Sequence, residues 1–239
     1  MIKFEIITIF PELFSSFCSE SIIKRAQKKR LIQIKVHNLR DFTKDVHKSV
    51  DDKPFGGGAG MVLKIEPIYK AVKKIRQVKE SKKQETKIIL FSPRGKQFDQ
   101  KTAVKLSKLK KIVMICGRYE GIDERVAEYI ADEQISIGNF VIMGGEVAAM
   151  TIMEAVSRLI PGVLGKADSL KATTPNKKKF IEYPQYTRPE IFNADKSEKK
   201  WKACPPKFRK TKFWRVPKVL VSGNHKKIKE WREKHSKIV

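Results

Sequence analysis

Glycine clusters stand at three places in the sequence where a ligand could approach the backbone closely. They occur in DDKPFGGGAGM (residues 51–61), GRYEG (117–121) and SIGNFVIMGGEVAA (136–149). Glycine has no side chain, so backbone amides and carbonyls in such segments can contact a bound group directly. The apolar residues of the third segment would supply walls for a flat, apolar group. We therefore expect shaped loops that bind a small molecule.

Three classes of ligand can be compared with these loops. No G-x-G-x-x-G motif opens a helix after the first expected strand, which argues against a dinucleotide. No G-x4-G-K-[ST] motif is present, and the loop at 51–61 lacks the lysine of a phosphate cradle, which argues against a nucleoside triphosphate. A nucleoside with an uncharged tail remains. Its adenine would lie against Ile137, Phe140, Val141 and Ile142.

The charge of the chain points to a second, polyanionic partner. The formal net charge is +26 for 239 residues, and basic side chains that neutralise phosphates give affinity for nucleic acids. A lysine-rich proteome could also raise the charge. However, residues 112–159 carry 3 Lys+Arg against 8 Asp+Glu and no lysine, whereas residues 1–111 carry 27 against 11 and residues 160–239 carry 22 against 7. This uneven distribution predicts a neutral-to-acidic catalytic core flanked by two basic surfaces for nucleic acid.

The elements that must position these loops follow from apolar periodicity. Strands are expected at 4–10, 31–39, 87–93, 111–117 and 133–143, and helices at 12–29, after Pro67, and at 97–109, 123–130, 147–160 and 224–236. Strands alternating with helices predict an α/β fold with a parallel sheet. The last three strands end in SPRG, GRYEG and MGGE, so a ligand crevice is expected at their carboxyl ends.

Composition also bounds the compartment and the domain organisation. Residues 1–30 contain neither a signal peptide nor an 18-residue apolar span, so neither export nor a membrane span is expected. Cys18, Cys116 and Cys204 are isolated, which suits a reducing cytoplasm and predicts no metal site. Cys116 is expected to be a buried structural thiol. Residues 163–182 have few apolar groups and are interpreted as a loop before a smaller, basic second unit.

Several long motifs resemble bacterial tRNA (guanine-N1)-methyltransferases of the SPOUT class. They are IITIFPELF (6–14), VDDKPFGGGAGM (50–61), GRYEGIDERV (117–126), SIGNFVIMGGE (136–146), SRLIPGVLG (157–165), YPQYTRPE (183–190) and SGNHKKIKEWR (222–232). The resemblance implies an α/β fold with a deep C-terminal trefoil knot, a small helical C-terminal domain, and a homodimer with its active site at the subunit interface. The corresponding domains are 1–165, an interdomain loop 166–182, and a basic tRNA-binding domain 183–239.

The resemblance also assigns residues to ligands. S-adenosylmethionine is expected at Pro93, Gly117, Tyr119, Glu120, Ile137, Gly138, Asn139, Phe140, Val141, Ile142, Gly144 and Gly145. Contact with tRNA is expected at His47, Asp51, Gly60, Arg188 and His225. The resemblance suggests that magnesium assists the reaction. The family often has tyrosine in place of Phe140 and proline in place of Ala59 and Ala148, which backbone recognition would tolerate.

The implied reaction methylates N1 of the guanine at position 37 of tRNA, next to the anticodon. Neutral guanine carries a proton on N1, so a general base must remove it, and a cation can stabilise the developing charge. Arg158 matches the family's arginine and is expected to stabilise this charge, with a simple cation at a helix C-terminus as the less favoured alternative. The family's aspartate position reads Thr173, and Asp168 is the candidate base, with another carboxylate or catalysis by positioning alone as alternatives.

Residues 193–215 form a lysine-rich insertion relative to the family pattern. Trp201 and Trp214 within it could stack on a base or pack in the protein. Together with the altered base position, the insertion leaves two alternatives open. The protein could methylate another RNA nucleotide, or it could be a catalytically weakened RNA-binding homologue.

Overall fold

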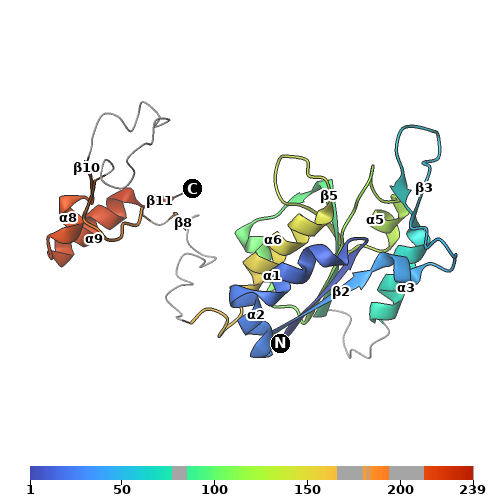
Figure 1. The fold of residues 1–239 in the computed structure, drawn as a ribbon, viewed down its shortest axis with the longest axis horizontal. Coiled ribbons are helices and arrows are strands. Elements are labelled where there is room, and N and C mark those ends of the chain that lie inside the picture. Colours follow the sequence, from blue (N-terminus) through green and yellow to red (C-terminus); the bar gives the residue numbers. More distant parts are fainter. Residues whose placement is uncertain (77–84, 166–179, 182, 194–212, 239) are drawn as a thin grey trace. The chain divides into compact units, whose positions relative to one another are not determined.

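The computed structural model describes residues 1–76, 85–165, 180–181, 183–193 and 213–238. Its contacts divide the chain into two compact units, Met1–Lys171 and Ala172–Val239. Figure 1 shows the elements of each unit. Within the described ranges, no helix has both the length and the apolar character needed to cross a membrane.

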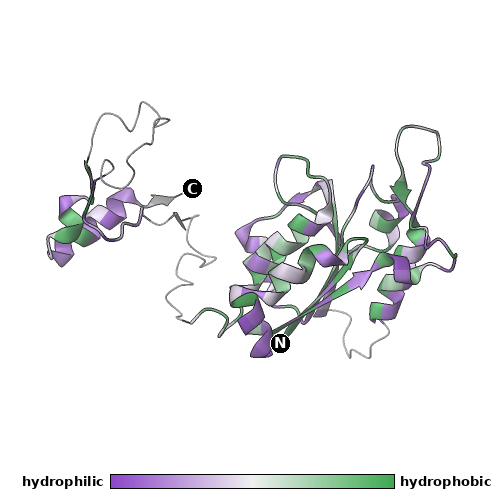
Figure 2. Cartoon of the chain, in the orientation of Figure 1, coloured by the Kyte–Doolittle hydropathy of each residue, from purple (hydrophilic) through white to green (hydrophobic). Residues whose placement is uncertain are grey.

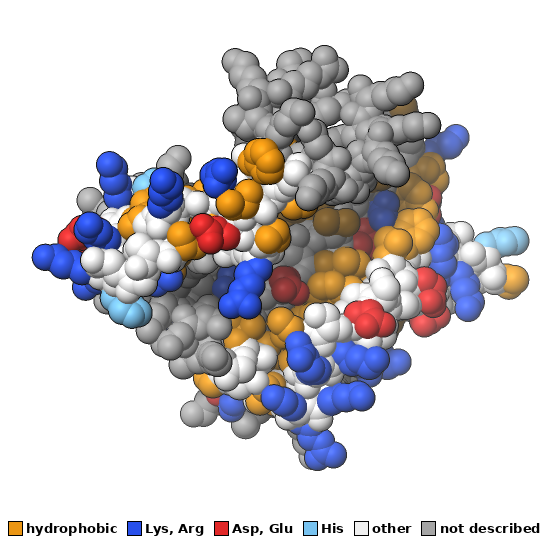
Figure 3. Space-filling view, turned by 60° about the vertical axis from the view of Figure 1, so that its left-hand side comes forward, with side chains coloured by type: hydrophobic (Ala, Val, Ile, Leu, Met, Phe, Trp, Pro, Cys, Tyr) orange, Lys and Arg blue, Asp and Glu red, His pale blue; other side chains and the backbone are white. Residues whose placement is uncertain are grey.

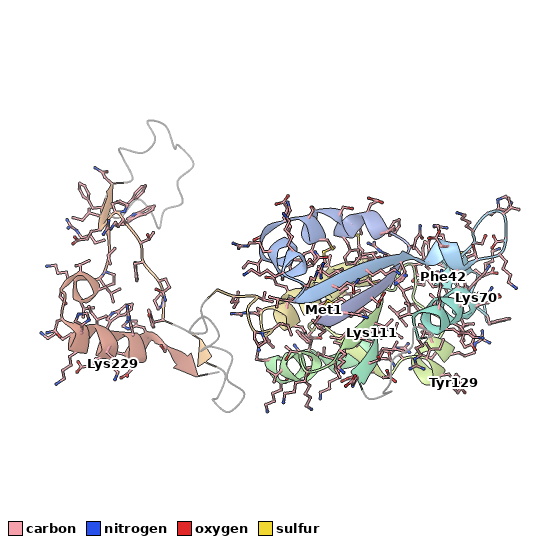
Figure 4. The ribbon with its side chains drawn as sticks, turned by 90° about the horizontal axis from the view of Figure 1, so that it is seen from below. Met1, Phe42, Lys70, Lys111, Tyr129 and Lys229 are labelled. Carbon is pink, nitrogen blue, oxygen red and sulfur yellow. The ribbon has the colours of Figure 1, made fainter. Side chains whose placement is uncertain are left out.

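The first unit is built on a five-stranded parallel sheet with strand order β2-β1-β6-β5-β7. Its strands are β1 (Ile2–Thr8), β2 (Ile32–Asn38), β5 (Thr86–Gln97), β6 (Lys111–Ile115) and β7 (Glu133–Ser136). Lys3 pairs with Lys111, so β1 and β6 begin at the same edge, close to the labelled Met1 and Lys111 in Figure 4. The predicted parallel sheet is confirmed. Its strands are rich in β-branched residues, as expected for strands buried on both faces.

Helices cover both faces of this sheet, as Figure 1 shows. One face carries α1 (Ser15–Ser19), α2 (Ser21–Lys28), α4 (Gln100–Leu106) and α6 (Gly145–Ser157), and the other carries α3 (Ile65–Arg76) and α5 (Arg125–Tyr129). Two 3-10 helices, η1 (Pro11–Phe14) and η2 (Leu39–Phe42), follow β1 and β2. Phe4 and Ile6 of β1 belong to the apolar core beneath α2, α4 and α6, whereas Ile7 belongs to the core beneath α3 and α5. Figure 2 shows the apolar strands between helices whose outer surfaces are hydrophilic.

Two predicted elements differ from the structure. The helix expected at 12–29 is divided into η1, α1 and α2, and Ser21 at the second division has a positive φ of 50°. The strand expected at 133–143 ends at Ser136. β7 is the last strand of the sheet, and the side chains of Phe140, Val141 and Met143 are exposed. The apolar run that suggested a strand therefore has no further sheet or core to pack against.

The second unit contains α8 (Lys218–Val221), α9 (His225–His235) and two short antiparallel pairs. In one pair β9 (Ile191–Asn193) lies beside β10 (Phe213–Arg215), and in the other β8 (Phe180–Ile181) lies beside β11 (Lys237–Ile238). The predicted helix near the C-terminus is confirmed as α9, where the side chain of Asn224 accepts a hydrogen bond from the Lys227 amide.

Candidate functional site

The segments at the carboxyl ends of β5, β6 and β7 enclose a cavity of about 280 Å³. The register between β5 and β7 shifts between Phe91 and Lys96, so the intervening residues leave the ladder and place Ser92 and Pro93 in the cavity wall. The remaining lining comes from residues 117–121 after β6 and from residues 135–137 and 140–145 at and after the end of β7, together with Phe91 of β5 and Ala148 of α6. This is the edge at which parallel α/β sheets bind ligands.

Most residues expected to contact the cofactor line this cavity. They are Pro93, Gly117, Tyr119, Glu120, Ile137, Phe140, Val141, Ile142, Gly144 and Gly145. Gly138 and Asn139 belong to the same loop but are not part of the lining, and a Cβ atom on Gly138 would collide with the Phe140 ring. Tyr119 has a φ of 59°, a backbone conformation rare for an aromatic residue and characteristic of functional sites.

Two glycines allow α6 to begin directly against the end of β6. The Gly145 amide donates a hydrogen bond to the Gly117 carbonyl at 3.0 Å. A Cβ atom on Gly145 would lie 2.7 Å from the Cα atom of Cys116, and a Cβ atom on Gly144 would collide with the Arg118 guanidinium. The glycine pair thus permits close contact between a helix and the cavity wall, as the sequence suggested.

A buried carboxylate below the cavity organises its wall. Glu146 is 0% exposed; it accepts hydrogen bonds from Thr8 Oγ1 at 2.7 Å and from Arg118 Nε at 2.9 Å. The Arg118 guanidinium also lies over the Phe10 ring, 4.8 Å from its centroid. Glu146 lies in the first turn of α6, where the helix dipole favours a negative charge.

Cys116 lies beside this network and is buried, as expected. Burial raises the pKa of its thiol well above the ordinary value, and the negative charge of Glu146 raises the pKa further. A protonated, buried thiol is a poor nucleophile. Cys116 therefore packs the end of β6 and does not contribute a reactive group.

The glycine-rich segment at 51–61 is bound to the cavity wall through its backbone. The Glu120 amide donates to the Met61 carbonyl, and the Leu63 amide donates to the Gly121 carbonyl, both at 3.0 Å. Gly60 has a φ of +79°, and a Cβ atom there would lie 2.5 Å from the Glu120 Cγ atom. This segment connects β3 (Asp51–Asp52) to β4 (Val62–Leu63) and stands next to the cavity.

The residues expected to contact tRNA lie in both units. In the first unit, His47 is exposed in a turn and Asp51 belongs to β3, next to the glycine-rich segment. In the second unit, Arg188 is exposed and His225 is the exposed first residue of α9. Among the expected residues of the first unit, Gly60 lies directly against Glu120 of the cavity wall.

Basic side chains outnumber acidic ones on α9 of the second unit. Figure 3 shows Lys and Arg side chains at many places on the visible surfaces of the described parts. Helix α9 carries Lys226, Lys227, Lys229, Arg232 and Lys234, with only two acidic residues. Trp214 packs against Phe192 across the β9–β10 pair, at 5.4 Å between ring centroids. Trp214 thus packs within the second unit, and its stacking on a base stays a prediction. Trp201 lies outside the described residues.

Of the two residues expected to take part in the chemistry, Arg158 lies within the described part of the chain. Arg158 caps the C-terminus of α6, and its amide donates to the Glu154 carbonyl. Ala148 lines the cavity, and Arg158 follows ten residues later, a distance of about 15 Å along a helix. That exceeds the length of an arginine side chain, so Arg158 does not reach the cavity of its own chain. Asp168 and Thr173 lie outside the described residues.

Sequence reasoning missed Arg118 of the cavity wall and Glu146, the buried carboxylate with which it pairs. Arg118 stands between two predicted cofactor residues in GRYEG, and Glu146 directly follows the predicted glycine pair. A charged residue inside an otherwise apolar, glycine-rich motif was the available signal. The pairing of the two could not be found, because they are 28 positions apart and meet only through the fold.

Comparison with known proteins identifies the family of the chain. A family model described as tRNA (Guanine-1)-methyltransferase TrmD matches residues 2–238. A tRNA (guanine-N(1)-)-methyltransferase of Dictyoglomus turgidum is 48% identical, covering 99% of this chain and 85% of the relative. Proteins of the same name from Dehalococcoides mccartyi and Ruminiclostridium cellulolyticum are 45% and 46% identical, each over 98% of this chain and over 85% and 91% of the relative, respectively. The chain therefore belongs to the tRNA (guanine-1)-methyltransferase family.

Proposed function

We propose that this protein transfers a methyl group from S-adenosylmethionine to N1 of the guanine at position 37 of tRNA, next to the anticodon. The observation that carries the proposal is the cavity at the ends of β5, β6 and β7, whose wall consists largely of the family's motif residues. We place the reaction in the cytoplasm, where tRNA is modified.

The cavity suits S-adenosylmethionine by its shape and chemistry. Phe140, Val141 and Ile142 offer apolar surfaces to an adenine ring, and Gly117 and Gly145 leave the backbone accessible. When bound, this cofactor supplies an electrophilic methyl group on a sulfonium. The residues of the chain hold and orient the nucleoside.

The chain must also remove the N1 proton of guanine as the methyl group is transferred. In the proposal Asp168 accepts this proton, and Arg158 stabilises negative charge on the base. Because the family's aspartate position reads Thr173, Asp168 is the first residue to test.

The position of Arg158 favours a homodimer with a shared active site. Arg158 lies about 15 Å along α6 from the cavity lining of its own chain, so it can act only on a cavity of another subunit. Val147 of α6 and Phe10 and Leu13 near η1 are exposed apolar residues on elements that contact each other. A second copy covering this surface would bring its own Arg158 to the cavity.

Two finer features of the fold belong to the proposal. We infer a deep trefoil knot around the cavity loops and a small, helical tRNA-binding domain at the C-terminus. The compact contact between the 117–121 loop and the start of α6 supports the knot, and the basic helix α9 supports the domain. A crystal structure of the dimer bound to tRNA, with the chain traced through residues 110–160 and 183–239, tests both.

Magnesium needs a separate test. Within the described parts of the chain, no group of three or more His, Cys, Asp or Glu side chains could hold a metal ion, so no step of the proposal passes through magnesium. Methylation measured with magnesium chloride and with EDTA shows whether the ion is required.

The decisive experiment measures methyl transfer from labelled S-adenosylmethionine to tRNA transcripts with guanine or adenine at position 37. We expect transfer to the guanine transcript only, and a loss of about 100-fold or more in Asp168→Ala, since general-base catalysis contributes about 10²–10⁴-fold. Wild-type activity in Asp168→Ala would exclude this base. Transfer at another nucleotide would favour the alternative RNA target, and cofactor binding without transfer would favour a weakened homologue.

Subunit sharing is tested by mixing two inactive variants. Arg158→Ala lacks the arginine, and Gly145→Val blocks the start of α6 in the cavity wall. If each active site takes Arg158 from the neighbouring subunit, mixed dimers contain one complete site and regain up to about half of the activity per dimer. Mixtures that stay inactive after verified subunit exchange would refute sharing.

A further inference from the structure

The wall of the cavity carries one cation and one carboxylate among the described residues. These are Arg118 and Glu120, and the other lining residues are uncharged at neutral pH. Such a wall is unusual for an apolar nucleoside site, because charged groups are costly to desolvate without a partner. The two opposite charges match a ligand whose tail is a zwitterion.

Arg118 is held in one position from three sides. Glu146 binds its Nε atom, the Phe10 ring supports one face of the guanidinium, and Gly144 leaves the space that the guanidinium occupies. Within the described parts of the chain, neither terminal nitrogen of the guanidinium has a hydrogen-bond partner, although the Arg118 side chain is only 21% exposed. A fixed guanidinium with unused donors is well suited to bind a carboxylate.

Burial of Glu146 requires an explanation beyond stability. Replacing a buried ion pair by apolar residues is often neutral or stabilising, so such a pair is weak evidence for a contribution to stability. The Thr8 hydroxyl and the Arg118 Nε atom satisfy the Glu146 carboxylate. The geometry of the network instead fixes the direction of one arginine at the cavity surface.

We propose that Arg118 binds the carboxylate of the amino-acid tail of S-adenosylmethionine, and that Glu146 is the residue that positions Arg118 for this contact. This inference rests on the proposed function, because it assigns one part of the same cofactor. The opposite charge of Glu120 suits the ammonium group of the tail.

Two ligands that differ only in the tail region test the assignment. S-adenosylhomocysteine retains the ammonium and the carboxylate, whereas 5′-methylthioadenosine lacks both and keeps the adenosyl group. Calorimetry gives the affinity of each ligand for full-length wild type and for Arg118→Met. We expect Arg118→Met to lower the affinity for S-adenosylhomocysteine by about 10- to 100-fold, as for loss of a charge-assisted hydrogen bond. The affinity for 5′-methylthioadenosine should change by less than about 2-fold.

A matched control separates charge from position. Arg125 pairs with Asp123, with 2.6 Å between Nη2 and Oδ2, and is not part of the cavity lining. Arg125→Met removes the same charge from the same unit and should leave both affinities unchanged. An equal loss of S-adenosylhomocysteine affinity in Arg118→Met and Arg125→Met would show a general electrostatic effect and overturn the assignment.

The role of Glu146 is tested with the neutral isostere Glu146→Gln. We expect a smaller, several-fold loss that is again confined to S-adenosylhomocysteine, because the guanidinium is less firmly oriented. The double variant Arg118→Met/Glu146→Gln leaves no buried carboxylate without its arginine. It should retain wild-type affinity for 5′-methylthioadenosine and lose no more S-adenosylhomocysteine affinity than Arg118→Met alone.

Three results overturn the inference. They are unchanged S-adenosylhomocysteine affinity in Arg118→Met, equal loss of both ligands in the double variant, and a loss confined to tRNA affinity, which would make Arg118 a phosphate contact. Failure of the proposed function has a different signature, because it is seen in the wild-type protein, which would then not methylate the guanine at position 37 whatever its affinity for the two adenosyl ligands.

Discussion

Substitution of Gly145 by alanine tests whether close packing at the start of α6 builds the cavity. The new Cβ atom would lie 2.7 Å from Cys116 Cα and 3.1 Å from the Gly117 amide nitrogen, both of them backbone atoms. Overpacking of this kind costs about 1–3 kcal/mol, while alanine in place of glycine in a helix returns up to about 1 kcal/mol. We therefore expect the free energy of unfolding to fall by about 1–2 kcal/mol.

The assay is thermal unfolding of wild type, Gly145→Ala and the control Gly165→Ala. A loss of about 1–2 kcal/mol lowers Tm by roughly 2–8 °C for a unit of this size. No atom lies within 4 Å of a Cβ built on Gly165, so its substitution should leave Tm unchanged or slightly raised. Affinity for S-adenosylhomocysteine should fall in Gly145→Ala only. Identical Tm and affinity in both variants would refute the packing argument.

Three further predictions concern the structure around the site. Gly95→Ala places a Cβ atom 2.5 Å from the backbone of β7 and should lower the free energy of unfolding by about 1–3 kcal/mol, measured in urea against the same control. Burial holds the pKa of Cys116 well above the ordinary thiol value of 9.0. In a variant whose other cysteines are serine, the native thiol should therefore resist alkylation at pH 8, and the free energy of unfolding should fall as pH rises above 9.0. Rapid modification of the native protein would contradict this. Asp99 caps α4 by accepting a hydrogen bond from the Thr102 amide at 2.7 Å, and this bond lowers the pKa of Asp99. Asp99→Ala should lower the free energy of unfolding in urea by about 1 kcal/mol. This contribution is present above pH 3.8 and is lost as pH falls through the lowered pKa, so an equal effect of the substitution at pH 7 and pH 2 would count against it.

Apolar periodicity predicted the sheet well, because the strands are buried on both faces. In β1, Phe4 and Ile6 pack against one core, and Ile7 packs against the other. A continuous run of β-branched and aromatic residues is typical of a strand that is buried on both faces of a parallel sheet. The glycine-bearing ends of β6 and β7 were equally informative, and they mark the cavity wall.

The same reasoning was wrong where apolar residues serve the cavity and not the core. Val141 and Met143 are as apolar as a buried strand requires, yet they are 80% and 90% exposed. Periodicity cannot distinguish a strand from a loop whose apolar side chains face a ligand or a partner. The contact between Arg118 and Glu146 was likewise beyond sequence reasoning, since nothing local relates the two residues.

The hydrogen bond between Thr8 and Glu146 joins residues separated by 138 positions. During translation at about 5–20 residues per second, Glu146 is added roughly 7–28 s after Thr8. β1 lies between β2 and β6, so it lacks β6 along one edge until residues 111–115 have been added. It lacks α6 over one apolar face until residues 145–157 have been added. Unpaired edges and exposed apolar strands promote association with other chains. The cavity therefore exists only in chains whose synthesis has passed α6, and the nascent protein must keep its first strand from aggregating until then.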